Sequence, residues 1–536
     1  GVRRGLIERP EKTLLDSINK ISDKNRYLCE MLRKDFGVKQ VNLQSVADSL
    51  ITGLLMLVSE VKNSLEWIKQ GTSQLNYREI DTILMALIAE GEDGLSNVRT
   101  EKVIEATDFK SLSAGAMDLG YVINSVMDMI KNISIDSTII IETKYGKIVL
   151  GSVNDDNYKD GRYLLIIDFG GDDIYRDCAV SDMKTPVSIV IDFDGNDTYL
   201  GKIGAGTGIC GYGIVVDCSG DDSYQADELG LGCGILGQGI LLDIAGNDNY
   251  SVEKYGQGAG LFGTGILSDI SGDDFYQGFQ SCQGFGFVKG CGVLIDRSGN
   301  DSYVARDDTI KYPSPQTKEH NVSLSQGMGF GVRADFSDGH SLAGGVGVLI
   351  DGVGDDKYSC GVFGQGCGYW FGTGILADFQ GNDVYNGVWY IQGACAHFAI
   401  GVLIDSCGDD KYNSLINMSQ GAGHDFSFGM LVDYRGDDFY NAPNLSLGAG
   451  NANGMGLFVD AFGNDEYVTH QGIVLGNSST ASRGSLRDFM KTIGIFIDGA
   501  GKDKYNEPFA KNKKVWKQTP PLKPALKTEL GIGIDY

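Results

Sequence analysis

One eight-residue motif recurs along most of the chain and constrains its fold more than any other feature. It reads Asp-x-x-Gly-x-Asp-x-Tyr, usually with Asp or Asn after the glycine, as in the segment from Asp243 to Tyr250. Most copies begin 24 to 28 residues after the previous copy, a constant period that is typical of a solenoid. The first aspartates of the clear copies are Asp168, Asp192, Asp217, Asp243, Asp269, Asp296, Asp351, Asp378, Asp405, Asp433, Asp460 and Asp498.

Each repeat supplies short strands that cannot bury their apolar face alone. A β-run such as Gly239 to Asp243 precedes the motif, and a variable segment follows its tyrosine. Stacking the copies at the strand spacing of about 4.8 Å buries that face. We therefore predict an α + β-solenoid chain with a β-helix of about 12–13 coils of 24–28 residues. A β-propeller, with about 40 residues per blade, fits this period less well.

A glutamine often follows the variable segment of the repeat. Stacked glutamines are expected to form a ladder in which each side chain bonds to the next coil. The members of this ladder are Gln257, Gln283, Gln365, Gln392 and Gln420.

The acids of the motif must be compensated if the coils stack. Gly246 and Asn247 suit a tight turn, Asp243 can accept bonds from turn amides, and Tyr250 is expected to join an aromatic ladder. Equivalent carboxylates about 4.8 Å apart repel by about 3 kcal/mol at an effective dielectric constant near 20. There are two ways to compensate this repulsion. Either backbone amides and water donate hydrogen bonds to each carboxylate, or cations bridge the carboxylates. Oxygen-rich turns suit calcium, which takes six to eight oxygen ligands.

Two of the turns, Gly195 to Tyr199 and Gly246 to Tyr250, resemble the Gly-x-Asp turn of the RTX calcium β-roll family. That family binds calcium between coils through aspartates and turn carbonyls, but its repeat is about nine residues long. The resemblance implies calcium as the one cofactor, bound by the second aspartate of each motif. Alternatively, each aspartate closes its own turn and binds no ion. The implied ligands are Asp173, Asp197, Asp222, Asp248, Asp274, Asp301, Asp356, Asp383, Asp410, Asp438, Asp465 and Asp503.

The chain divides by pattern into three parts. Residues 1–135 carry apolar residues at helical spacing, with helices predicted near 43–69, 78–89 and 114–133, among others. Residues 136–508 form the repeat domain, with insertions at about 304–343 and 469–492, and residues 509–536 form a tail rich in Lys and Pro. Its end, 531–536, repeats the β-run and can add a final strand. We expect the helical domain to cap the open edge of the first coil.

An enzymatic alternative rests on polar residues outside the repeat. Parallel β-helices include polysaccharide lyases and hydrolases, so the alternative is a carbohydrate-active enzyme with its site near the 304–343 insertion. The aspartates of the repeat single out no catalytic residue, because they recur in every coil. Candidates near the insertion are His320, Arg333, Asp335, Asp338, His340, His397, His424 and Asp425.

Composition narrows the choice of partner. A formal net charge of −26 argues against nucleic acid, and no apolar stretch reaches transmembrane length. The 11 cysteines are odd in number and argue against a full disulfide framework. We predict a non-enzymatic scaffold that binds a protein or polysaccharide partner and can join a larger complex. An extracytoplasmic or cell-surface location is expected if a signal peptide has been removed before Gly1.

Overall fold

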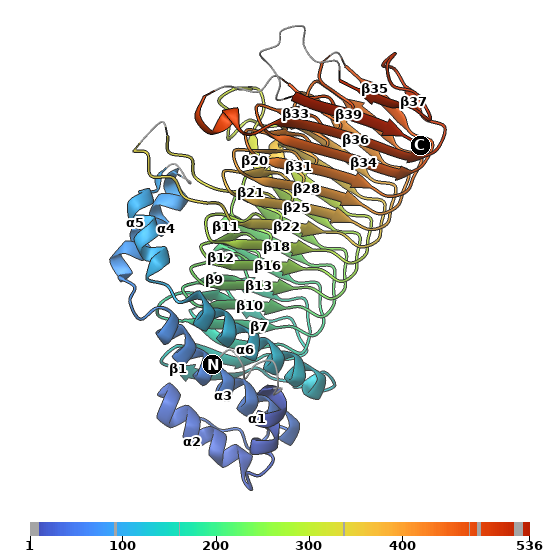
Figure 1. Ribbon diagram of the computed structural model, residues 1–536. Coiled ribbons are helices and arrows are strands. Elements are labelled where there is room, and N and C mark those ends of the chain that lie inside the picture. The colour runs from blue at the N-terminus through green and yellow to red at the C-terminus, as the bar shows by residue number, and fades with distance from the viewer. Residues whose placement is uncertain are drawn as a thin grey trace. The chain divides into compact units, whose positions relative to one another are not determined.

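The computed structural model describes residues 10–90, 94–159, 161–335, 338–470, 472–479, 484–518 and 529–536. The chain forms two compact units, Gly1–Ala245 and Gly246–Tyr536. In Figure 1 the first unit runs from blue to green and the second from green to red.

Helices fill the N-terminal part of the first unit, as predicted. The Asp23 carboxylate caps the second helix by accepting from the Arg26 amide, and Gly37, at φ 74°, ends it. Asp108 caps the last helix by accepting from the amides of Lys110 and Ser111. Within the described residues there are six helices: α1 (Pro10–Ile18), α2 (Lys24–Phe36), α3 (Asp48–Gly71), α4 (Tyr77–Glu90), α5 (Asn97–Glu105) and α6 (Phe109–Ile130).

The coils of the first unit contribute strands to three sheets. Sheet 1 contains β1 (Ile139–Thr143), β2 (Gly146–Leu150), β4 (Tyr163–Ile167), β7 (Val187–Ile191), β10 (Tyr212–Val216) and β13 (Gln238–Leu242). Sheet 2 contains β3 (Asn157–Tyr158), β5 (Ile174–Arg176), β8 (Thr198–Ile203) and β11 (Ser223–Leu229). Sheet 3 contains β6 (Val180–Ser181), β9 (Thr207–Ile209) and β12 (Gly234–Ile235).

The second unit repeats the same three sheets over more coils. Its sheet 1 contains β16 (Thr264–Ser268), β18 (Cys291–Ile295), β22 (Val346–Ile350), β25 (Thr373–Asp378), β28 (Ile400–Asp405), β31 (Phe428–Asp433), β34 (Met455–Phe462), β36 (Thr492–Ala500), β39 (Glu529–Asp535) and β38 (Val515–Lys517). Sheet 2 contains β14 (Asn249–Val252), β17 (Phe275–Gly278), β19 (Ser302–Ala305), β23 (Lys357–Gly364), β26 (Val384–Trp389), β29 (Lys411–Ser414), β32 (Phe439–Ala442), β35 (Glu466–Thr469) and β37 (Lys504–Tyr505). Sheet 3 contains β21 (Gly329–Phe330), β24 (Gly368–Tyr369), β27 (Cys395–Ala396), β30 (Gly423–His424) and β33 (Gly450–Asn451), while β15 (Gly260–Leu261) occupies the equivalent place in an earlier coil.

Successive coils pair in parallel and in register, so equivalent residues of the motif stack. Asp378 pairs with Asp405 between β25 and β28, and Tyr385 pairs with Tyr412 between β26 and β29. A column of inward leucines, including Leu376, lies at 0% exposure beneath sheet 1. The predicted fold class, helices followed by a β-solenoid, is therefore confirmed.

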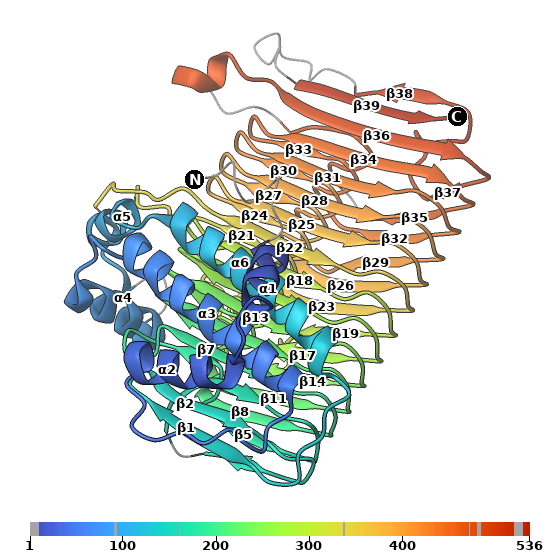
Figure 2. The same cartoon turned by 90° about the horizontal axis from the view of Figure 1, so that it is seen from below.

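The helices contact the edge hairpin of β1 and β2, where the Lys144 amide donates to the Phe36 carbonyl at 2.9 Å, and extend over a face of the later coils. The edge strand of sheet 1 in this unit is β1, which pairs antiparallel with β2. Helices α2, α3 and α6 share one hydrophobic core with outward residues of β4, β7 and β10, and Figures 1 and 2 show α3 and α6 lying over these strands. We expected a cap on the first coil. The outer face of sheet 1 is apolar as well as the inner one, so the helices bury more surface there.

The glutamine ladder bonds to backbone rather than to side chains. The Gln392 amide donates to the carbonyls of Tyr385 in its own coil and Asn413 in the next, both at 3.2 Å. Gln257 bonds in the same way to Tyr250 and Gln277. Each amide thus joins two coils, as expected, through their carbonyl oxygens.

The insertions add local structure to the second unit. In the first insertion β20 (Val322–Ser325) pairs with β23, and the Tyr312 hydroxyl donates to Glu253 at 2.9 Å. The described part of the second insertion contains a short 3₁₀ helix, Ser485–Asp488. The expected final strand is confirmed, since β39 pairs in parallel with β36. Residues 519–528 of the predicted Lys- and Pro-rich tail lie outside the described residues.

Candidate metal centre: the buried aspartate columns

Each coil turns at its motif, and glycine lets successive turns stack closely. A Cβ added at Gly381 would lie 1.6 Å from the carbonyl oxygen of Gly354 in the preceding coil. Only glycine tolerates this backbone contact. The turn therefore brings the aspartates of adjacent coils close together.

The first aspartate of the motif accepts a hydrogen bond from the tyrosine of the preceding coil. The Tyr358 hydroxyl donates to Oδ2 of Asp378, and the Tyr385 hydroxyl donates to Oδ2 of Asp405, each at 2.7 Å. The rings of Tyr358 and Tyr385 stack with centroids 4.8 Å apart. In these coils the tyrosine and the first aspartate tie neighbours together, whereas Tyr467 donates to Asp460 of its own coil. The predicted aromatic ladder is present.

The second aspartate, the predicted calcium ligand, ties coils together through the backbone. The Asp356 amide donates to Oδ1 of Asp383, and the Asp383 amide donates to Oδ1 of Asp410, each at 2.7 Å. The same bond joins Asp173 to Asp197 at 2.6 Å. One oxygen of the second aspartate is therefore used in the turn stack.

The other oxygen of the second aspartate has no donor. Among the described residues, Oδ2 is buried and accepts no hydrogen bond at Asp197, Asp301, Asp356, Asp383, Asp410, Asp438, Asp465 and Asp503. A buried carboxylate oxygen without a donor is costly. A proton or a cation at this oxygen would remove the cost.

Carboxylates of the same and the next coil lie close to one another. Asp192, Asp197 and Asp217 each place one carboxylate oxygen within 4.8 Å of the others, and all three residues are buried. Asp168, Asp173 and Asp192 form an equivalent triad, as do others along the coils. The sequence prediction named the second aspartates but missed the first aspartates as members of these groups. The register of the motif could have revealed them, because both aspartates recur in every coil.

Burial raises the pKa of these acids. It raises the pKa of Asp197 to about 8 and that of Asp383 to about 9, with nearby aspartates adding to the shift. Burial likewise raises the pKa of Asp410 to about 11. In the absence of a cation, burial therefore favours the protonated form of these acids.

The oxygen set fits a hard divalent cation. Calcium prefers carboxylate oxygens, and carboxylates from two coils converge within coordination reach of one another. Two aspartates per coil carry two negative charges when ionised, which one divalent cation would balance. Ligation by the twelve predicted aspartates stays a prediction.

A second polar site lies on sheet 3 of the second unit and its flanking loops. Arg333 donates to both oxygens of Asp335, at 2.6 and 2.8 Å, and its Nη1 lies 2.9 Å from Nε2 of His397. Nδ1 of His397 lies 2.8 Å from Oδ2 of Asp425, and Oδ1 of Asp425 contacts Arg487. We call Arg333, Asp335, His397, Asp425 and Arg487 the Arg–His–Asp network.

The network unites several of the enzymatic candidates and leaves others apart. The ring of His424 lies 5.4 Å from that of His397, and burial lowers the pKa of His424 to about 4. His320 instead pairs with Asp307, Nδ1 to Oδ2 at 2.6 Å, and the His340 amide donates to Asp338. The sequence analysis missed Arg487 because this residue lies in the second insertion, where the repeat period does not predict which residues come together.

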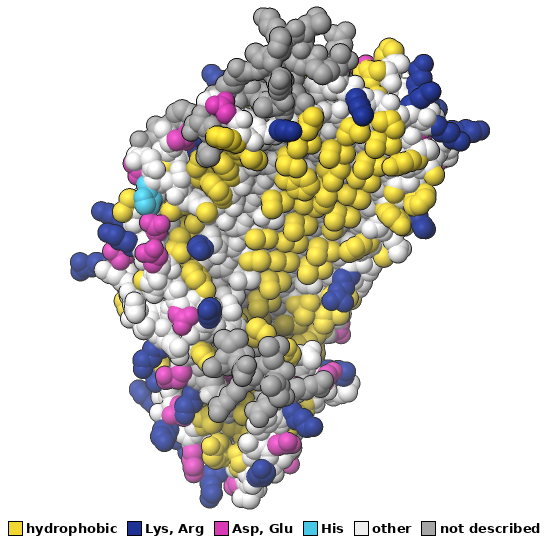
Figure 3. Space-filling model, in the orientation of Figure 1, with side chains coloured by type: hydrophobic (Ala, Val, Ile, Leu, Met, Phe, Trp, Pro, Cys, Tyr) yellow, Lys and Arg dark blue, Asp and Glu magenta, His cyan; other side chains and the backbone are white. Residues whose placement is uncertain are grey.

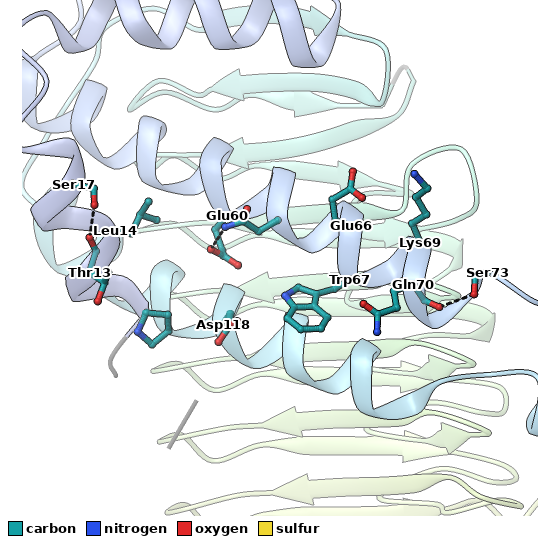
Figure 4. Close-up of a pocket in the computed structure, with 12 residues that line it drawn as sticks. Thr13, Leu14, Ser17, Glu60, Glu66, Trp67, Lys69, Gln70, Ser73 and Asp118 are labelled. Atoms are coloured by element: carbon teal, nitrogen blue, oxygen red, sulfur yellow. Dashed lines mark hydrogen bonds between the residues drawn. The ribbon is translucent and has the colours of Figure 1, made fainter. Parts of the chain in front are cut away.

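A pocket of about 880 Å³ lies among α1, α3 and α6 of the first unit. Figure 4 shows Glu60 and Trp67 of α3 and Asp118 of α6 around it. Burial raises the pKa of Glu60 to about 7 and also raises that of Asp118. The pocket is therefore acidic in composition but only partly charged near neutral pH.

The fold and the columns define a class of protein, a β-solenoid with an internal carboxylate column and a helical layer on one unit. No family model, curated protein or solved structure matches the chain. Among the described helices, none is both long enough and apolar enough to cross a membrane.

Proposed function

We propose that the protein is a non-enzymatic scaffold that presents a long, acidic β-solenoid to a protein or polysaccharide partner. The observation that supports this proposal is how the repeated polar groups are used. The motif tyrosine and both motif aspartates bond between coils, as at Tyr358, Asp378 and Asp383. Their recurrence is thus explained by holding coils together.

Calcium is proposed to stabilise the coils. The donor-free oxygens, such as Oδ2 of Asp383, need a proton or a cation. Calcium binding between coils would satisfy them and would bind only the folded chain, so it would raise stability by mass action. The resemblance to the RTX turn points the same way.

Thermal unfolding tests this proposal. Chelation should lower the melting temperature, and calcium should restore it more fully than magnesium, which demands tighter octahedral geometry. Elemental analysis of the purified protein should find calcium. If chelation does not change the melting temperature and the purified protein contains no metal, turn closure by protonated aspartates is favoured.

The variant Asp383→Asn separates the cation from the proton. If calcium is bound, the amide removes a charged ligand and weakens the response to calcium. If a proton is shared, the new amide donates in place of the acid and stability changes little. Asp355→Asn is the matched control, because Asp355 lies exposed in an adjacent turn and accepts from Asn382.

A second candidate function rests on the Arg–His–Asp network. His397 lies between Arg333 and Asp425, and Arg487 contacts Asp425. An anionic sugar would have to draw Arg333 away from Nε2 of His397 before this nitrogen could act in acid–base chemistry. If the protein is a polysaccharide lyase or hydrolase, it should release unsaturated products or new reducing ends from acidic polysaccharides. His397→Ala should then abolish the release without shifting the melting temperature. No product from the wild type would exclude this candidate for the polysaccharides tested.

A further inference from the structure

The outer face of sheet 1 in the second unit is a broad apolar surface. Its side chains belong to residues one, three and five positions before the first aspartate of each coil. In the last coil Asp535 is equivalent to this first aspartate. Across the nine parallel strands from β16 to β39, only Thr264, Ser268 and Thr373 among these positions are polar, and none is charged. We call these positions the bare face.

The bare face is open to solvent over much of its extent. Val346, Ile400 and Leu530 are 39%, 45% and 48% exposed. Figure 3 shows hydrophobic side chains forming one broad area over the strands that Figure 1 labels β18 to β36. A contiguous apolar area of this size marks an interaction surface.

The solenoid repeat does not by itself require an apolar outer face. On sheet 2 of the same unit the outward positions include Lys357, Ser359, Asn386, Lys411 and Asn413. Sheet 2 thus shows the polar outside of an ordinary half-exposed sheet. Of these two sheets, only sheet 1 has outward positions that are almost uniformly apolar.

In the first unit the same motif positions lie under helices. Leu165, Ile189 and Ile214 each stand three residues before a first aspartate, and each is at most 3% exposed. They belong to the core that α3 and α6 share with the sheet. The chain itself therefore shows which kind of element covers this face, namely a pair of amphipathic helices.

The contact of that helix pair is close. A Cβ added at Gly115 of α6 would lie 2.5 Å from the Tyr212 hydroxyl oxygen, which donates to the Leu112 carbonyl at 2.7 Å. A small residue at the crossing point lets helix and sheet approach. A partner helix should carry such a residue within its apolar stripe.

The dimensions of the bare face match a layer of helices packed side by side. Eight strand spacings give a length of about 38 Å, and five residues along a strand give a width of about 16 Å. Figures 2 and 4 show α3 and α6 running along the strands that they cover. Helices packed about 8–10 Å apart in that orientation each cover about two strands, so about four such helices would cover the bare face. Helices α3 and α6 have 24 and 22 residues. The projected area of about 600 Å² approaches the roughly 800 Å² per partner of a stable interface.

We propose that the bare face binds amphipathic α-helices of a partner protein, packed side by side and lying along its strands as α3 and α6 do in the first unit. The apolar stripes of these helices replace in the second unit what α3 and α6 supply in the first. This inference rests on the proposed scaffold function and names the chemistry of its partner.

Binding of a defined probe tests the proposal. The probe is a fluorescent synthetic hairpin that carries residues 48–71 and 109–130 joined by a Gly/Ser linker, and the full chain is the receptor. Fluorescence anisotropy should show binding to the wild type. The double variant Val346→Glu with Ile400→Glu should bind about tenfold or more weakly, because it places two charges in the apolar contact. The matched control is Ser359→Glu with Asn386→Glu on sheet 2, which should bind like the wild type.

Other outcomes overturn the proposal. If the probe does not bind and the wild type dimerises while the face variant is monomeric, a second copy covers the face. If the wild type, but not the face variant, floats with phosphatidylcholine vesicles, a lipid surface covers it. If the wild type binds neither the probe, nor a second copy, nor vesicles, the bare face is not an interaction surface. If the double variant has a lower melting temperature than the wild type, the binding assay is repeated with Leu530→Glu, on the last strand of the bare face. Because the assay reads association and not melting, its failure is distinct from a failure of the calcium proposal.

Discussion

Sheet 1 has the same apolar outer positions in both units but a different environment in each. In the first unit Ile189 and Ile191 are fully buried beneath helices. In the second unit Val402 and Ile404 occupy the corresponding positions and stay partly exposed. The comparison shows that the repeat specifies an apolar outside, and that a separate element decides whether this outside meets water.

Removing the helices should give the largest effect. Deletion of residues 1–135 would expose the outer face of β4, β7 and β10, leaving both units bare. We expect insoluble or heavily associated protein, measured by sedimentation after expression. A soluble, monomeric truncation would break the comparison, because it would show that the first unit does not need its cover.

Paired truncations should give the next largest effect. Ile189→Ala removes methyl groups from the buried interface and should lower the free energy of unfolding by about 2–5 kcal/mol. Val402→Ala on the bare face should cost less than about 1 kcal/mol, because its neighbours are partly solvated. Denaturant midpoints of both variants measure the difference. Equal losses would mean that the two faces are alike in the folded protein.

Glu60 of α3 should give the smallest effect. Burial raises its folded pKa to about 7, above the usual value near 4.3. Its stabilising contribution is therefore complete below about pH 4.3 and is lost as the pH rises through about 7. Glu60→Gln should have a melting temperature that changes less between pH 5 and pH 8 than that of the wild type, by a few degrees. A parallel pH dependence in the two proteins would show that Glu60 does not titrate in this range.

The sequence predicts the stacking of coils because equivalent residues recur at a nearly constant interval. The aspartates and tyrosines therefore fall into columns without knowledge of any side-chain geometry. The sequence does not predict which carboxylate oxygen accepts from which backbone amide, because this depends on side-chain rotamers. The Asp383 carboxylate, for example, accepts from the Asp356 amide. The contact between Arg487 and Asp425 could not be predicted either. Arg487 lies in an insertion, so the period of the repeat does not predict its position.

The position of the helices could not be predicted for another reason. The apolar run before Asp192 and the run before Asp405 look alike in sequence, yet only the first is covered. Helix length and amphipathicity indicate that α3 and α6 pack on something. They do not say whether it is the edge of the first coil or the side of several coils.

The stacked tyrosines give the molecule an internal optical reporter. Tyr358, Tyr385 and Tyr412 lie ring to ring at 4.8 Å and nearly parallel, so their electronic transitions couple. The near-ultraviolet circular dichroism of an intact column should exceed that of isolated phenols. Burial holds the pKa of Tyr385 well above its usual value. Exposed tyrosines such as Tyr77 and Tyr536 contribute phenolate absorbance in the folded protein. The further absorbance from the column would appear only as coils open, and it would time their separation.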